Sequence, residues 1–256
     1  MRISQVALQL FTIRDHFETA ADMAASFRKV KDIGYQAVQL GGLGPATEDE
    51  VAKMLADEGL VCCSSHEDSM QILDEPQTII ARLAKYHCKS VGYPYPAGIK
   101  LDTLDDVKSL AARLDAVGDT YRSAGISLAY HNHTVEFRRF DGRLMLDVIY
   151  EETDPRNVMA EPDTYWIQYG GGDPEKWCRR LKGRLPLLHL KDYKVTAEQR
   201  PDFAEIGSGN LDWPAIIAAA EDSGCQWFIV EQDRCDGDSL ASARISFEYI
   251  RDNLCS

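Results

Sequence analysis

Residues 103–125, TLDDVKSLAARLDAVGDTYRSAG, followed by residues 126–133, ISLAYHNH, contain the pattern that decides the fold. The first segment is expected to form a long helix that ends at Gly125, since glycine is favoured just after a helix. The second segment is a short apolar run, which is typical of a buried strand. Together they predict a helix that leads into one strand of a parallel sheet.

The same alternation runs from one end of the chain to the other. Strands are expected at residues 4–10, 35–42, 60–66, 88–96, 126–133, 157–163, 185–192 and 225–233. Helices are expected at residues 20–34, 47–59, 75–87, 103–125, 142–153, 173–184, 211–224 and 239–254. No Pro/Ser-rich linker or shift in composition divides these eight units. They therefore predict a (β/α)8 TIM barrel, with residues 1–256 as a single domain.

A doubly wound open sheet is the alternative arrangement of the same elements. Such a sheet usually has a glycine-rich phosphate-binding turn after its first strand. Residues 11–17, FTIRDHF, stand at that place and contain no glycine. The barrel is therefore the preferred prediction.

The composition argues against several classes of partner. A net charge of −13 and an isoelectric point of about 4.9 oppose binding to nucleic acid or to an anionic membrane, because phosphate binding needs a basic surface. No apolar run approaches the ~18–20 residues of a membrane span. The seven cysteines form no CxxC motif, and the first residues lack the features of a signal peptide. A cytoplasmic protein with reduced thiols is expected.

Polar residues gather at the C-terminal ends of the predicted strands, where the active sites of such barrels lie. They are Gln9, Arg14, Gln39, His66, Tyr93, His131, His133, Glu161, Asp163, His189, Lys191, Asp192, Glu231 and Asp233. Four of the six histidines of the chain belong to this set. A random distribution would seldom place them so.

His131 and His133 are the most informative pair. Residues two apart on a strand point to the same side, so both imidazoles are expected at the barrel mouth. A structural pair that caps the core is the alternative. With carboxylates on neighbouring strands, the pair favours a divalent metal site, and the mixed nitrogen and oxygen donors suit Mn, Mg, Co or Zn. Gly207 and Gly209, in the long loop at 201–213, are weaker candidates as phosphate-approach points or hinges.

Several motifs, in their order and spacing, resemble the sugar phosphate isomerase/epimerase group of the xylose-isomerase-like TIM-barrel superfamily. The motifs are YHNHTVEF (130–137), EPDTYW (161–166), LLHLKDY (187–193), AEIGSGNLDW (204–213) and IVEQD (229–233), with LQLFTIRD (8–15) at the start. The resemblance covers essentially the whole chain. The motif set is specific for the family, but it does not identify a substrate.

The resemblance implies one divalent metal at the barrel mouth, with ligands from the fifth strand and from Asp163, His189 and Glu231. In many sugar epimerases of the superfamily, the fifth strand offers a glutamate where His131 stands. Either His131 is itself the ligand, or Glu136 folds back to supply the carboxylate. Glu136 is the preferred ligand, because it keeps three carboxylates and one histidine around the metal.

The remaining roles follow from the same resemblance. His133, together with His131, is then the expected base, and Glu231 is expected to take part in proton transfer as well as in metal binding. Lys191 is a candidate to stabilise an oxyanion, and a salt bridge to a neighbouring acid is its alternative. The residues expected to contact the substrate are Arg14, His66, Glu161 and Lys191.

The activity that the resemblance implies is a metal-dependent isomerase or epimerase, which removes a proton next to the carbonyl of a sugar or keto-sugar through a metal-stabilised enediolate. A histidine-rich fifth strand also resembles inosose dehydratases and enzymes that eliminate from 3-keto sugars, so a lyase is the alternative. A nuclease for abasic DNA is opposed by the acidic composition. A non-catalytic sugar-binding barrel would hold no metal. The expected partner is a small-molecule sugar or sugar derivative, and a homo-oligomer is possible.

Overall fold

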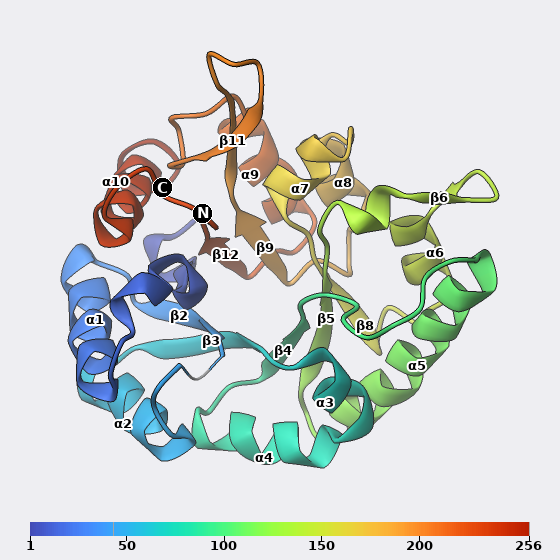
Figure 1. Ribbon diagram of the computed structural model, residues 1–256, viewed down its shortest axis with the longest axis horizontal. Helices are drawn as coiled ribbons and strands as arrows, with labels where there is room; N and C mark the ends of the chain where they lie inside the picture. The colour runs from blue at the N-terminus through green and yellow to red at the C-terminus, as the bar shows by residue number, and fades with distance from the viewer. Residues whose placement is uncertain (43, 256) are drawn as a thin grey trace.

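The strands form one sheet that curves into a nearly closed barrel (Figure 1). The computed structural model describes residues 1–42 and 44–255. The sheet has the order β8-β5-β4-β3-β2-β1-β12-β9, and its neighbouring strands are parallel. The strands are β1 (Val6–Gln9), β2 (Ala37–Gly41), β3 (Val61–His66), β4 (Ser90–Tyr93), β5 (Ser127–His131), β8 (Val158–Glu161), β9 (Leu187–Leu190) and β12 (Trp227–Val230). A parallel bridge between Asp163 and His189 joins the two outer strands.

Helices surround the barrel (Figure 1). They are α1 (Ala20–Ile33), α2 (Glu48–Glu58), α3 (Ser69–Asp74), α4 (Pro76–Lys85), α5 (Leu104–Ser123), α6 (Met145–Glu151), α7 (Thr164–Tyr169), α8 (Pro174–Arg180), α9 (Trp213–Asp222) and α10 (Ser239–Asn253). Thr19, Thr47 and Thr103 begin α1, α2 and α5 with capping boxes. Gly59 ends α2 with a left-handed φ of 58°, which glycine adopts without strain. Among the described residues, no helix is both long and apolar enough to cross a bilayer.

Alternating residues of the strands point into the barrel and form two layers there. The lower layer is apolar and consists of Ala7, Ala37, Cys63, Ala129, Leu187 and Ile229. Two residues further along five of these strands stand Gln9, Gln39, His131, His189 and Glu231. Because strand side chains have a period of two, these polar residues share the inward face. The barrel therefore carries a polar layer at the C-terminal ends of its strands.

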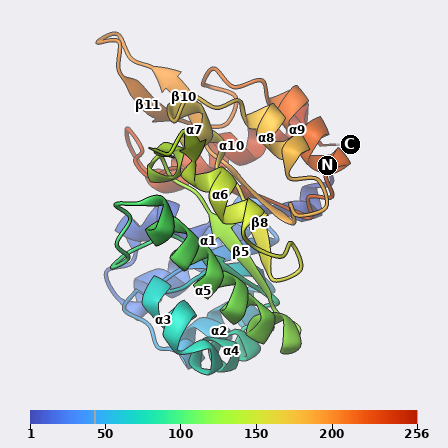
Figure 2. The ribbon, with the colours of Figure 1, turned by 90° about the vertical axis from the view of Figure 1, so that its right-hand side faces the viewer.

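Each of the eight predicted strands and eight predicted helices is present, and several short segments add to them. The loop expected after the seventh strand contains an antiparallel hairpin of β10 (Asp192–Val195) and β11 (Pro201–Ala204), which projects from the barrel (Figure 2). The other additions are α3, α7, β6 (Arg139–Phe140), β7 (Arg143–Leu144) and the 3-10 turns η1 (Ile3–Gln5), η2 (Leu10–His16) and η3 (Val135–Phe137). Most of these segments are too short for a periodic pattern to be recognised.

Candidate active site

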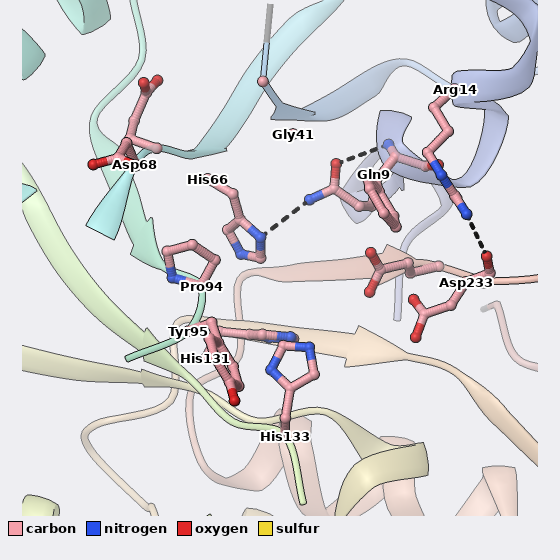
Figure 3. Close-up of a pocket in the computed structure, with 14 residues that line it drawn as sticks. Gln9, Arg14, Gly41, His66, Asp68, Pro94, Tyr95, His131, His133 and Asp233 are labelled. Carbon is pink, nitrogen blue, oxygen red and sulfur yellow. Dashed lines mark hydrogen bonds between the residues drawn. The ribbon is translucent and has the colours of Figure 1, made fainter. Parts of the chain in front are cut away.

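A cavity of about 610 Å³ opens at the polar layer (Figure 3). Its lining includes seven of the residues singled out from the sequence, which are Gln9, Arg14, His66, His131, His133, Glu231 and Asp233. The cavity has the size of a small-molecule site. The structure thus brings together residues that lie more than 200 positions apart in the chain.

Four buried side chains bring metal-ligating atoms together at the base of this cavity. One donor atom from each of His131, Asp163, His189 and Glu231 lies within 4.8 Å of the others. Oδ2 of Asp163 is 4.0 Å from Nε2 of His131 and 4.0 Å from Nδ1 of His189. Nδ1 of His189 is 2.9 Å from Oε2 of Glu231. Oδ2 of Asp163 is buried and accepts no hydrogen bond from the described residues. This donor set, in which one buried oxygen accepts no directed hydrogen bond, fits a divalent transition metal.

Lys191 places a positive charge beside the same carboxylates. Its Nζ lies 2.9 Å from Asp163 Oδ2, 2.7 Å from Glu231 Oε2 and 2.9 Å from Asp233 Oδ1. Burial opposes the charge, but the three carboxylates raise the pKa of Lys191 well above its ordinary value. The contact with Asp163 is close without being directed as a hydrogen bond. Lys191 is fully buried and does not line the cavity. Its position therefore matches the salt bridge to neighbouring acids that the sequence offered as the alternative to oxyanion stabilisation.

His189 lies between two carboxylates, one at each ring nitrogen. Its Nδ1 faces Glu231, and its Nε2 is 3.3 Å from Oε1 of Glu161. Burial disfavours the imidazolium, yet Glu161 and Glu231 raise the pKa of His189 to about 10. A metal ion needs a neutral imidazole, so ion binding at His189 would release its proton.

Glu161 lies beneath His66 rather than in the cavity lining. Nε2 of His66 is 2.7 Å from its Oε2, and the side-chain amide of Gln39 donates to its Oε1. Burial opposes its ionisation, but His66 and His189 hold the pKa of Glu161 at about 2. A second group with converging donor atoms, His66, His131, Glu161 and His189, shares this carboxylate. Because both oxygens of Glu161 are already engaged, it orients its neighbours more readily than it binds a metal.

His133 lies just beyond the end of β5, because the strand ends at His131. Its ring nevertheless stands beside that of His131, with centroids 4.9 Å apart, and both rings line the cavity. The Nδ1 atom of His133 is buried without a hydrogen-bond partner among the described residues. Burial, and then the charge of Lys191, lower the pKa of His133 to about 3. The imidazole is therefore neutral near pH 7.

Glu136 does not join the metal-ligating cluster, and here the structure differs from the sequence-based expectation. The turn η3 directs its carboxylate back to the chain, where Oε1 accepts a hydrogen bond from the Tyr130 hydroxyl at 2.8 Å and Oε2 accepts one from the His133 amide at 2.7 Å. Glu136 is fully buried, and burial raises its pKa to about 7. Its oxygens hold the loop after β5, and the strand-five donor in the cluster is His131.

The two glycines of the long loop do not offer free amides to a phosphate. The backbone N–H groups of Gly207 and Gly209 donate to Oδ2 of Asp192 at 2.9 and 3.1 Å. The indole N–H of Trp213 donates to the same oxygen at 2.8 Å. Asp192 therefore anchors the loop, which is a structural role for that residue.

Sequence reasoning missed several residues of the site, among them Gly92 and Phe11. Gly92 stands on the inward face of β4, and a Cβ there would overlap His66 and the Glu161 carboxylate. A glycine at an inward strand position was the available signal, since it often marks close approach of other groups. Phe11, on η2, lines the cavity and is 40% exposed. A large apolar residue just after a strand's C-terminal end was the signal for it.

Comparison with known proteins places the chain in a family. The family model described as a xylose isomerase-like TIM barrel matches residues 27–253. An inosose dehydratase of Lacticaseibacillus casei is 28% identical over 147 residues, which are 52% of this chain and 49% of that protein. The chain thus spans about half the length of this curated relative.

Solved structures share the fold over nearly the full chain. A sugar phosphate isomerase/epimerase from Parabacteroides distasonis ATCC 8503 has a TM-score of 0.85 at 22% identity, covering 99% of this chain and 96% of that chain. An L-ribulose 3-epimerase has a TM-score of 0.76 at 17% identity, covering 98% and 94%. At these identities the likeness shows the fold alone. With the family model matching most of its length, the chain belongs to the xylose isomerase-like TIM-barrel family.

Proposed function

We propose that this chain is a divalent-metal-dependent carbon–oxygen lyase that acts on a keto-sugar or a cyclic keto-polyol such as an inosose. The observation that carries the proposal is the convergence of four buried donor residues beneath a cavity that is lined by the neutral imidazole of His133. A bound divalent ion would polarise the substrate carbonyl and so acidify the adjacent C–H bond. The inosose dehydratase among the relatives supports elimination as the outcome.

The residues that would hold the ion are His131, Asp163, His189 and Glu231. His131 takes the place that was expected for Glu136, whose two oxygens are occupied by the loop. Burial lowers the pKa of His131 well below its ordinary value, so its imidazole is neutral, as a metal ligand must be.

His133 is the proposed base. It lines the cavity, its Nδ1 has no partner among the described residues, and its imidazole is neutral near pH 7. We assign to it the removal of the proton from the carbon next to the substrate carbonyl. Tyr95 and Trp166 stand at 5.6 and 5.4 Å from its ring, measured between centroids, and they restrict its orientation.

Asp233 is the proposed acid. It lines the same cavity, and its Oδ1 lies 2.9 Å from the Lys191 ammonium, which can resupply the proton that Asp233 delivers. In the elimination, His133 takes the proton, the C–O bond at the next carbon breaks with its electron pair, and the leaving oxygen takes a proton from Asp233. The products are an unsaturated ketone and either water or an alcohol. Figure 3 shows His133 and Asp233 as separate parts of the cavity wall.

Epimerisation is the second candidate, and the same pair of residues supports it. His133 and Asp233 come from different strand ends, β5 and β12, so each could serve one face of a substrate carbon. Return of a proton to the carbon that lost one would give an epimer of unchanged mass. The absence of a strand-five carboxylate from the described cluster makes this outcome second to elimination.

Product analysis by mass spectrometry tests the proposal. The purified protein, loaded with Mn²⁺, Co²⁺ or Zn²⁺, is incubated with an inosose. A product lighter by one water, formed only with metal, is expected. An isomer of equal mass would instead establish epimerisation, and turnover that survives complete removal of metal would refute both.

Variants test the assigned roles. His133→Ala should lose turnover by a factor of about 10²–10⁴ while it keeps the bound metal, and Glu231→Ala should lose both. His87→Asn is the matched control, because His87 is exposed and has a left-handed φ of 51° that asparagine tolerates. Undiminished turnover in His133→Ala would exclude His133 as the base.

A further inference from the structure

Two buried glutamines lie in the polar layer of the barrel, and neither takes part in the proposed proton transfers. They are Gln9 of β1 and Gln39 of β2, and both side chains are fully buried. Burial of a side-chain amide costs free energy unless its hydrogen bonds are made inside the protein. The partners of these two amides therefore indicate what the pair does.

The backbone fixes which way both amides point. The N–H of Phe11, which can only donate, lies 3.2 Å from Oε1 of Gln9. The NH₂ group of Gln9 donates to Oε1 of Gln39 at 2.7 Å, and it also faces Nδ1 of His66 at 3.5 Å (Figure 3). The NH₂ group of Gln39 donates to Oε1 of Glu161 at 2.5 Å. The hydrogen-bond network thus assigns Oε1 of Gln39 as an acceptor.

Glycines on two strands leave the space that this network needs. Gly41 lies on β2, and a Cβ there would stand 2.7 Å from Oε1 of Gln9 and 3.2 Å from the Cβ of Phe11. Gly92 on β4 does the same at the other end of the network, where a Cβ would stand 2.6 Å from the carboxylate of Glu161. A glycine inside a strand often marks such a close approach.

Gln39 in turn decides which nitrogen of His189 carries hydrogen. Nε2 of His189 lies 2.6 Å from Oε1 of Gln39, nearer than the 3.3 Å that separates it from Oε1 of Glu161. Because an amide oxygen can only accept, Nε2 is the donor in this contact. In the neutral imidazole the lone pair is then on Nδ1, which faces Oε2 of Glu231 at 2.9 Å and Oδ2 of Asp163 at 4.0 Å. Nδ1 is therefore the nitrogen that can bind an ion.

The two histidines of the metal-ligating cluster differ in this support. Nδ1 of His131 is buried and has no hydrogen-bond partner among the described residues. A histidine that binds a metal usually donates its second N–H to an acceptor, which fixes both the tautomer and the orientation of the ring. His189 has such an acceptor in Gln39.

We infer that Gln39 is a positioning residue for the metal site, because its amide oxygen holds the hydrogen of His189 on Nε2 and keeps Nδ1 directed at the ion. The inference rests on the metal site of the proposed function, and it adds a residue that touches neither the ion nor the substrate. An amide oxygen fixes the imidazole without adding another negative charge to a layer that already contains Glu161, Asp163 and Glu231.

The tautomer of His189 can be observed directly by NMR. In Zn²⁺-loaded protein with ¹⁵N-labelled histidine, long-range proton–nitrogen correlation spectra report which ring nitrogen binds the ion and which carries hydrogen. The wild type should show His189 bound through Nδ1, with a protected hydrogen on Nε2, and His189→Gln assigns its signals. In Gln39→Met the Nε2 hydrogen signal should be lost to exchange with water. Ligation of His189 through Nε2 in the wild type would overturn the inference, whether or not the variant folds.

Metal affinity provides an independent measurement. Gln39→Met should raise the Kd for Zn²⁺, measured by competition with a chelator, by about 10–100-fold. Gln232→Met is the matched control, because Gln232 is a buried glutamine whose side-chain amide donates to the Arg234 carbonyl and not to the cluster. This control should bind Zn²⁺ as the wild type does. An unchanged Kd in Gln39→Met would overturn the inference, as would an equal rise in both variants.

The outcomes separate this inference from the proposed reaction. The expected tautomer and affinities, in a protein that does not convert an inosose, would establish the role of Gln39 and reject the lyase. Metal-dependent elimination from an inosose, with an unchanged Kd in Gln39→Met, would keep the reaction and reject the positioning role. A wild type that binds no divalent ion would overturn both.

Discussion

Replacing Glu136 by glutamine should make the protein more stable at pH 8 and leave its stability nearly unchanged at pH 4.5. A glutamine at this place can keep both contacts, with its oxygen accepting from the His133 amide and its NH₂ group donating to the Tyr130 hydroxyl. The variant therefore removes a buried ionisable group without removing its hydrogen bonds.

The magnitude follows from the pKa. Burial raises the pKa of Glu136 from 4.5 to about 7, although the Tyr130 hydroxyl and the His133 amide oppose the shift. Between these values the folded protein retains a proton that the unfolded chain has released, so stability falls as the pH rises through this window. A separation of about 2.5 pH units, at ~1.4 kcal/mol per unit, corresponds to about 3–4 kcal/mol at pH 8.

Urea unfolding at several pH values between 4.5 and 8 measures this effect, because the other titrating groups cancel in the difference between wild type and variant. Glu198→Gln, on the exposed tip of the β10–β11 hairpin, is the control for a glutamate outside the core. The wild-type free energy of unfolding should fall relative to Glu136→Gln as the pH rises. A difference that stays constant with pH would refute the reasoning, and loss of bound metal in Glu136→Gln would restore the fold-back carboxylate as a ligand.

Three further variants probe the site and its supports. Asp163→Asn removes the carboxylate whose buried Oδ2 accepts no hydrogen bond. Bound divalent metal, measured by elemental analysis, should fall below about a tenth of the wild-type content, and full metal content would remove Asp163 from the ligand set. Asp192→Asn places an NH₂ group against the N–H donors of the 205–213 loop. The free energy of unfolding should fall by about 3 kcal/mol, which lowers the melting temperature by ~6–12 °C. A shift under about 2 °C would contradict the anchoring role of Asp192. Gly92→Ala introduces a methyl group that overlaps His66 and Glu161. Turnover of an inosose should fall by at least about tenfold, while circular dichroism shows that the protein remains folded. Wild-type turnover would show that the placement of His66 is unimportant.

Much of the fold could be predicted because the patterns behind it are local. Apolar runs of strand length alternate with helical segments that begin at threonine caps and end at glycines, as at Thr47 and Gly59. Eight repeats of this unit leave few parallel arrangements other than a barrel. The hairpin of β10 and β11 escaped prediction because its two strands, DYKV and PDFA, contain no continuous apolar run of strand length.

Part of the candidate site could likewise be predicted from the sequence, and part depends on the tertiary structure. The sequence placed His131, His189 and Glu231, together with Asp163, at strand ends that meet at the same edge of the barrel, and the family resemblance implied Asp163, His189 and Glu231 as metal ligands. Asp163, two residues beyond the end of β8, joins them because its backbone bridges to His189 where the barrel closes. That closure is a tertiary event that no local pattern encodes.

By itself, the sequence determined the order of the elements, the barrel, and the edge at which the polar residues gather. Only the tertiary structure decided that Glu136 binds Tyr130 and the His133 amide, and that Lys191 pairs with three carboxylates instead of facing the cavity. The physical reason is that strand periodicity sets the direction of a side chain only within the strand. Beyond the strand end, and among buried charges, a side chain turns toward the partners that can compensate its loss of water, and those partners come from distant parts of the chain.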